Sequence, residues 1–198
     1  MTSDTMLVRD LVLAGAAGIA IAAACGLRAF LPLPALGLGV RFGLVHVDPS
    51  AAWIGSTPAL VSLVWAALLE IVGDKIPALD HLLDLAGTLV RPAAAMIAGW
   101  CTFRGVHPAV AAVAAVLLGA GTMGVHVTKA KVRLGSSMLT FGSANPLLSF
   151  VEDAIATGLS ALALLAPIAG VLTAIAVVWM LRRVFRPPHP RAERSALR

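Results

Sequence analysis

The stretch LLEIVGDKIPALDHLLDLAGTLVRP, residues 68–92, places four carboxylates between two apolar runs: Glu70, Asp74, Asp80 and Asp84. The whole chain of 198 residues has only 10 Asp and Glu, so this segment carries four of the ten. Acidic side chains so close to runs of Ala, Val, Leu and Ile are costly unless something compensates their charge. Any fold and function assigned to the chain must account for them.

The composition of the chain is that of a membrane protein. Hydrophobic residues make up 59% of the sequence and charged residues 13%, and the mean hydropathy is +0.92. Soluble domains are about 45–50% apolar and about 25% charged. A helix needs about 20 apolar residues to cross a bilayer. The sequence therefore predicts an all-α, polytopic membrane protein with about six transmembrane helices and no separate soluble domain.

Charges and Pro/Gly clusters divide the apolar runs into a single predicted transmembrane domain, residues 1–186. Pro32 and Pro34 forbid a continuous helix after the first run, so a broken or re-entrant segment is expected there. Pro167 and Gly170 predict a tight turn or a sharp kink between the last two runs. The predicted spans are residues 9–28, 58–74, 89–104, 107–129, 146–166 and 168–186.

The basic residues predict an orientation. With the N-terminus in the cytoplasm, twelve of the fifteen Lys and Arg fall on the cytoplasmic side, as the positive-inside bias requires. Both termini are then cytoplasmic. The basic tail, residues 187–198, is expected to be disordered and to contact anionic lipid headgroups. Nucleic-acid binding is not expected, because no fold presents these charges. The alternative of a cleaved N-terminal signal is disfavoured by Asp4 and Asp10, which precede the apolar run.

Helical periodicity predicts a polar stripe in the opening stretch. If the second span continues past residue 74, Glu70, Asp74, His81 and Asp84 lie on one face. Pro77 would free backbone carbonyls beside them, and the group would form an oxygen-rich site for a cation or a proton. The identity of any metal stays open. In the alternative interpretation Asp80 and Asp84 belong to a solvent-facing amphipathic helix in a cytoplasmic loop.

Other polar residues in apolar surroundings are candidates for the same site. Arg28 ends the first apolar run, and NPLLSFVEDAIATG places Asn145, Glu152 and Asp153 at the start of the fifth. We expect Arg28 to pair with Glu152 or Asp153 across the bundle, although snorkelling to the nearer interface would also explain it. Cys25 and Cys101 have no neighbouring metal-ligand pattern, and no cofactor is predicted.

Two further patterns concern the assembly of the helices. Three spans in each half would place the halves in opposite orientations, so an inverted repeat is possible from the topology. The chain also has eighteen Gly and many Ala, which allow helices to pack closely in lipid, within one chain or between copies in a homo-oligomer.

Several motifs resemble a known family. CGLRAFLPLPALGLGVRFG, LLEIVGDKIPALDHLLD, HVTKAKVRLGSS and NPLLSFVED are similar to segments of the bacterial membrane proteins grouped as the domain-of-unknown-function family 4126, over roughly residues 10–185. The resemblance implies a multi-pass protein of the bacterial inner membrane with no assigned activity. A partial likeness to the E-x-G-D-[KR]-[ST] motif of manganese/calcium cation exchangers spans residues 70–76. It has one extra residue, no hydroxyl and no second copy.

Three classes of function remain open from the sequence. The favoured one is a small transporter or permease, proton- or cation-coupled, with an unknown solute and with Glu70 and Asp74 as the titrating or ion-binding pair. The second is a membrane-embedded enzyme on a lipid-linked substrate, with Lys129, Lys131 and Arg133 at a phosphate. No nucleophile–base pair is visible, so an enzyme is the less favoured class. The third is a membrane scaffold that moves no solute.

Overall fold

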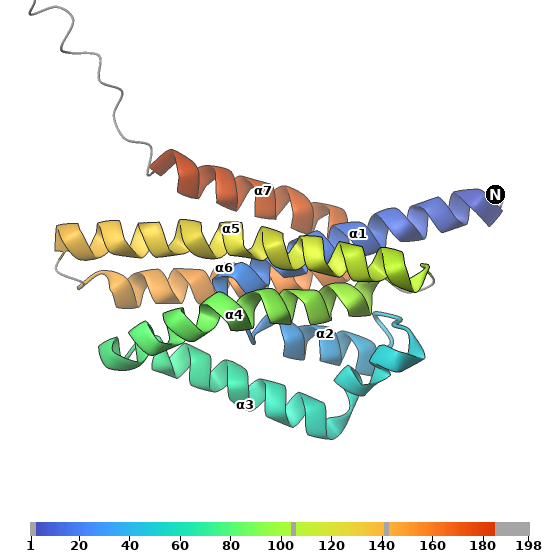
Figure 1. The fold of residues 1–198 in the computed structure, drawn as a ribbon, viewed down its shortest axis with the longest axis horizontal. Helices are drawn as coiled ribbons and strands as arrows, with labels where there is room; N and C mark the ends of the chain where they lie inside the picture. The colour runs from blue at the N-terminus through green and yellow to red at the C-terminus, as the bar shows by residue number, and fades with distance from the viewer. Residues whose placement is uncertain (1–2, 104–105, 141–142, 185–198) are drawn as a thin grey trace, which may run out of the picture.

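The computed structural model describes residues 3–103, 106–140 and 143–184, and this part of the chain is all-helical (Figure 1). The predicted tail, residues 187–198, lies outside the described residues. The elements are α1 (Ser3–Leu27), α2 (Pro32–Arg41), the 3-10 helix η1 (Pro49–Gly55), α3 (Thr57–Gly73), α4 (Pro77–Thr102), α5 (Pro108–Thr140), α6 (Asn145–Leu165) and α7 (Pro167–Val184). The predicted all-α class is confirmed.

Helix α1 is the centre of the bundle and packs against α4, α5, α6 and α7. Small residues allow this close packing: Ala20 and Ala24 are fully buried, and a Cβ at Gly26 would lie 2.5 Å from the Cβ of Val125. Thr122 adds a polar contact, because its Oγ1 donates to the carbonyl of Ala22 at 2.9 Å. The core is therefore built around the one helix that touches most of the others.

The chain breaks where α1 ends. Pro32 and Pro34 stand in the first turn of α2, where a missing N–H costs nothing, and α2 runs back toward the end of the bundle at which α1 begins (Figure 1). At 1.5 Å per residue the ten residues of α2 extend only about 15 Å, half the thickness of the hydrocarbon core. The broken segment expected from the prolines is present.

The predicted stripe on a continuous second helix is wrong. Helix α3 ends at Gly73, and α4 begins at Pro77, which occupies the N-terminal turn instead of interrupting a helix from within. Glu70 and Asp74 therefore belong to one helix and Asp84 to the next. The apolar part of α4 begins at Leu82, earlier than the predicted start at residue 89.

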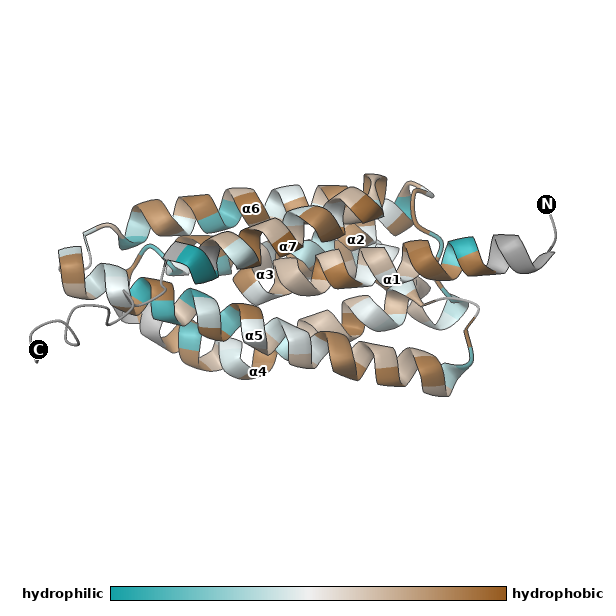
Figure 2. Cartoon of the chain, turned by 90° about the horizontal axis from the view of Figure 1, so that it is seen from above, coloured by the Kyte–Doolittle hydropathy of each residue, from teal (hydrophilic) through white to brown (hydrophobic). Residues whose placement is uncertain are grey.

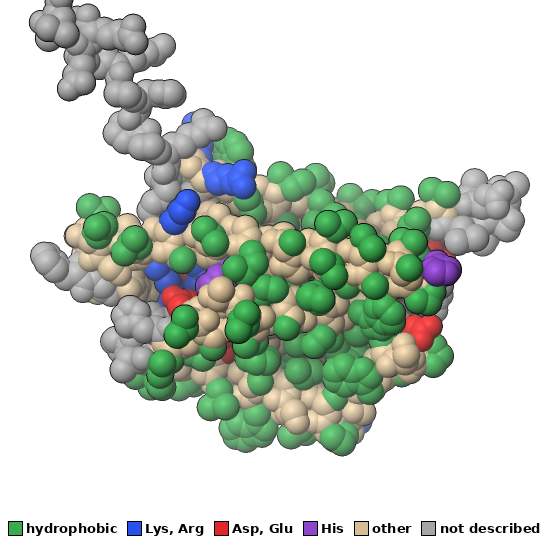
Figure 3. All heavy atoms as spheres, in the orientation of Figure 1, with side chains coloured by type: hydrophobic (Ala, Val, Ile, Leu, Met, Phe, Trp, Pro, Cys, Tyr) green, Lys and Arg blue, Asp and Glu red, His purple; other side chains and the backbone are tan. Residues whose placement is uncertain are grey.

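Four described helices are long and apolar enough to cross a membrane: Val8–Leu27, Leu82–Thr102, Pro108–Thr140 and Asn145–Leu165. Helices η1 and α3 form a bent pair at 58° that raises the number to five, and Pro167–Met180 is a shorter apolar helix. Large apolar side chains cover much of the outer surface (Figure 3). Leu89 and Leu139 are among the exposed ones. The predicted boundaries of six spans stay a prediction.

The two ends of the described chain lie at opposite ends of the bundle, in both views of the ribbon (Figures 1 and 2). This arrangement follows from the break after Leu27, because α1 enters the bundle and α2 leaves by the same end. The sequence predicted both termini in the cytoplasm, and the side of the membrane that each terminus occupies stays a prediction.

The distribution of basic residues gives the arrangement a direction. Lys and Arg gather near the end of the bundle where α5 and α7 end, and the opposite end shows acidic and imidazole side chains (Figure 3). The positive-inside bias predicts that the end that carries the C-termini of α5 and α7 faces the cytoplasm.

We expect a cysteine introduced at Ser3 to react with a membrane-impermeant maleimide on intact cells. A cysteine introduced at Ser195, which follows α7 in the sequence, should react only after the cells are opened. The native Cys25 and Cys101 are buried, so they should react little with the maleimide, and the protein without an introduced cysteine serves as the control. Reaction of both introduced cysteines from the same side would contradict the opposed termini.

Candidate functional site

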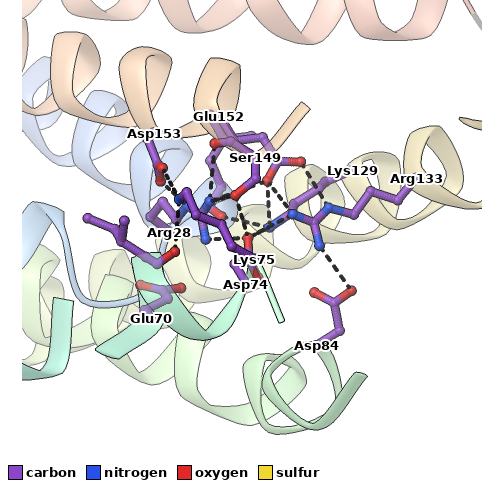
Figure 4. A network of polar contacts seen from close by, with 12 residues as sticks. Arg28, Glu70, Asp74, Lys75, Asp84, Lys129, Arg133, Ser149, Glu152 and Asp153 are labelled. Atoms are coloured by element: carbon purple, nitrogen blue, oxygen red, sulfur yellow. Dashed lines mark hydrogen bonds and ion pairs between the residues drawn. The ribbon is translucent and has the colours of Figure 1, made fainter. Parts of the chain in front are cut away.

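A buried network of ion pairs joins α1, α3, α4, α5 and α6 near the point where α1 ends (Figure 4). Among the side chains that the structure describes, it contains five basic and five acidic ones. The members are Arg28, Lys75, Arg91, Lys129 and Arg133, with Glu70, Asp74, Asp84, Glu152 and Asp153.

Arg28 is at the centre of this network. Its side chain is 0% exposed, and its Nη1 pairs with Oδ2 of Asp74. Its Nε lies 2.6 Å from Oδ1 of Asp153, and its Nη2 donates to Oγ of Ser149 at 2.8 Å and lies 3.9 Å from Glu152. The ion pair expected between Arg28 and an acid of the second half is thus present. Snorkelling to an interface does not describe a guanidinium this deeply buried.

Asp74 receives its stabilisation from cations and not from its own helix. It follows the last residue of α3, where the negative end of the helix dipole disfavours a carboxylate. Nη2 of Arg133 donates to Oδ2 of Asp74 at 2.7 Å, and Nζ of Lys129 lies 4.0 Å from the same oxygen. With Arg28 as well, three basic side chains surround one fully buried carboxylate.

Glu152 shares two of these cations with Asp74. Its Oε2 lies 2.9 Å from Nζ of Lys129 and 3.2 Å from Nη2 of Arg133. The two acids come from different helices, α3 and α6, and the two cations both come from α5. The cations on α5 therefore hold the end of α3 and the first turns of α6 together.

Lys75 closes the network on the side of α6. Its Nζ lies 3.2 Å from Oδ2 of Asp153 and 4.5 Å from the centre of the Phe150 ring, a cation–π contact. It also donates to the carbonyl of Ile71 at 2.9 Å. Lys75 lies in the turn after α3, which ends at Gly73.

Glu70 has a different role from the one predicted for it. Its two carboxylate oxygens accept hydrogen bonds from the backbone N–H of Ala29 at 2.8 Å and of Phe30 at 2.9 Å. On the other side of the break, Nζ of Lys129 donates to the carbonyl of Leu27 at 3.2 Å. Charged side chains thus satisfy backbone groups that the broken helix leaves unpaired. Glu70 thus contacts backbone N–H groups at the break, whereas Asp74 pairs with Arg28 and Arg133 in the same network.

Arg91 of α4 forms the outer part of the network. Its Nη1 contacts Nδ1 of His126, and its Nη2 lies 3.5 Å from Oδ1 of Asp84 and 4.0 Å from Oε1 of Glu70. Asp84 is half-buried and also lies 4.0 Å from Nη1 of Arg133. The solvent-facing alternative for Asp84 therefore does not describe it.

The predicted candidate Asn145 makes a different contact. The amide of Asn145 donates to Oγ of Ser137 at 3.0 Å, at the junction of α5 and α6. The side chains of Asp80 and His81 lie outside the described residues. Among the side chains that the structure does describe, no group of three or more His, Cys, Asp and Glu is arranged to hold a metal ion.

Sequence reasoning missed the polar face of α5 and the two residues that complete the site, Arg91 and Ser149. Thr122, His126, Lys129 and Arg133 are all buried and follow one another at intervals of four, three and four residues. That spacing places them on one side of a helix. The signal was present in the sequence, but Lys129 and Arg133 were interpreted as basic residues flanking a shorter span.

Comparison with known proteins gives a family. The model of the domain of unknown function DUF4126 matches residues 16–187, which include every residue of the network. The chain belongs to this family. Comparison with curated proteins and with solved structures gives no match. The family membership agrees with the predicted resemblance and leaves the activity to be inferred from the site.

Replacing Arg28 by Ala should destabilise the protein by about 3–5 kcal/mol, because it leaves buried carboxylates without their cation. Thermal unfolding in detergent measures the loss. Arg9→Ala is the matched control: Arg9 of α1 pairs with Asp10 in an exposed position, so little change is expected there. Equal melting temperatures for Arg28→Ala and Arg9→Ala would show that the buried network does not support the fold.

Replacing Glu70 by Ala should open the junction between α1 and α2. The change leaves the N–H groups of Ala29 and Phe30 without their acceptors, at a cost of about 1–3 kcal/mol for each. Hydrogen exchange at these two amides should become faster, with Glu70→Gln intermediate because its amide retains one acceptor oxygen. Unchanged exchange in both variants would mean that Glu70 does not cap the break.

Proposed function

We propose that the protein is a small membrane transporter in which the buried network exchanges protons and a charged solute. The observation that carries this proposal is Asp74: a fully buried carboxylate among Arg28, Lys129 and Arg133, at the point where two helices end. The solute class follows from the site, which recognises charge: a small ion or a charged metabolite.

Stability alone is a poor reason for such a network. Replacing a buried ion pair by apolar side chains of similar volume is often neutral or stabilising, because desolvation of the ions offsets their attraction. Ionisable residues within membrane segments mark ion pathways and proton relays far more often than they serve packing. The retention of so many charges in a chain that is otherwise 59% hydrophobic favours a functional role.

The sharing of partners gives the network a way to exchange charge. Asp74 and Glu152 both lie within ion-pair distance of Lys129 and Arg133. When one carboxylate takes up a proton, the cations retain the other carboxylate as a partner. A proton or a solute ion therefore enters without leaving a buried charge wholly uncompensated, which would otherwise cost several kcal/mol.

The broken helix supports the same proposal. Interrupted helices at membrane depth occur where they line protein or a water-filled cavity, and in secondary transporters their ends contribute to the substrate site. The end of α1 contributes Arg28 to the network, and the backbone beside it is held by Glu70 and Lys129. Movement of α3 or α5 would therefore change both the side chains of the network and the backbone at the break after Leu27.

Transport is tested with purified protein in vesicles that contain a pH-sensitive fluorophore. Gradients of small inorganic ions and of charged metabolites are imposed one at a time, and proton movement is recorded. We expect at least one gradient to drive protons through the wild type. Asp74→Asn and Glu152→Gln keep the side-chain shape and remove the charge, so both should abolish the coupling.

The matched control is Asp10→Asn, the same chemical change at an exposed acid on α1, which should leave the flux unchanged. The variants are compared only after their melting temperatures show that they are folded. A wild type that moves protons no faster than empty vesicles in every gradient would favour the scaffold. Coupling that persists in Asp74→Asn would remove the network from the transport route.

A further inference from the structure

A groove of about 500 Å³ lies between α5 and α7 over the surface of α1, away from the ion-pair network. Its floor consists of Ile19, Ala22 and Ala23 of α1, and Val125 and Ile175 contribute to its walls. Ligand sites of small molecules have volumes of about 300–1,000 Å³. The small side chains of Ala22 and Ala23 leave space there between the two flanking helices.

The groove has one charged end. Among its described lining residues the only ionisable side chain is Arg182, in the last turn of α7, and Trp179 lies one turn before it. Arg183 packs on the Trp179 ring with its guanidinium carbon 5.0 Å from the ring centre. Trp and Arg together are typical of the membrane interface, and basic pockets between helices on the cytoplasmic side bind anionic lipid headgroups.

We propose that this groove binds one anionic phospholipid, with an acyl chain along the apolar floor and the phosphate at Arg182. The charge fits, since an apolar slot with a guanidinium at its interfacial end complements a chain with a phosphate at its head. The site goes beyond the proposed transport function and does not depend on it.

The size of the groove favours a lipid chain over a second copy of the protein. A transmembrane helix about 30 Å long and about 10 Å wide occupies on the order of 2,000 Å³, several times the volume of the groove. An acyl chain is flexible and thin enough to lie between α5 and α7. The basic segment after α7 is a poor occupant, because its Arg residues would face an apolar floor and the like charge of Arg182.

Two glycines of α5 provide a matched pair of variants. Gly121 lines the groove and Gly124 does not, and a Cβ added at either position meets no atom within 4 Å. Gly121→Leu should fill the groove without disturbing the helix packing. Gly124→Leu adds the same side chain to the same helix outside the groove. Both changes favour the helix equally, so any difference between them reports on the groove.

Native mass spectrometry from micelles doped with phosphatidylglycerol or with phosphatidylcholine measures the lipid that each variant retains. We expect one phosphatidylglycerol on the wild type and on Gly124→Leu, and loss of it in Gly121→Leu. Arg182→Gln should bind about fivefold more weakly, the change that corresponds to one basic residue at an anionic surface.

Three outcomes would overturn the proposal. Equal retention of the two lipids would mean that Arg182 does not recognise a phosphate. Equal retention in Gly121→Leu and Gly124→Leu would place the lipid elsewhere. Dimers in the wild-type spectrum that are lost only in Gly121→Leu would make a second copy of the chain the occupant. The two glycine variants decide the question even if Arg182→Gln fails to fold.

Discussion

The buried guanidinium of Arg28 is the constraint on which the rest of the structure depends. It lies where the central helix ends, and it pairs with Asp74 at the end of α3 and with Asp153 in α6. The carboxylate of Asp74 is fully buried and that of Asp153 is mostly buried, so both are stabilised by a cation beside them. A single side chain therefore fixes the distance between three helices that are far apart in the sequence.

The site and the fold cannot be separated in this protein. Lys129 pairs with Glu152 and also donates to the carbonyl of Leu27, and Glu70 accepts two backbone N–H groups at the same break. In a soluble protein water would satisfy these backbone groups, but the centre of a membrane protein has none to spare. The charged residues stabilise the break in the backbone after α1. The break, in turn, lies inside the bundle and keeps these charged side chains away from lipid. This mutual dependence explains why so many charges occur in so apolar a chain.

The sequence correctly predicted the features that depend on composition and on the small number of charged residues in apolar segments. The all-α class followed from hydropathy, and the pairing of Arg28 followed from the few acids available in apolar surroundings. The stripe on the second helix failed because Pro77 fits two roles, a break within a helix or the first turn of a new one, and local sequence does not choose between them. The length of the apolar run Val8–Leu27 is enough to cross a bilayer, but length alone does not show where the helix ends relative to the others, and tertiary contacts place the end of α1 inside the bundle.

Charge balance limits what the network can do. Among the side chains that the structure describes, five basic groups face five acidic groups, so in the proposed transporter a solute ion would take the place of a charge that is already there. A cation would enter if a proton leaves or a basic side chain withdraws from its acid, and an anion would enter if an acid is protonated or displaced. Each of these exchanges would couple the solute to a proton or to the movement of α3, α5 or α6. In the proposed transporter, coupling would therefore follow from keeping a buried site close to neutral, with the same side chains that hold the backbone at the break after Leu27.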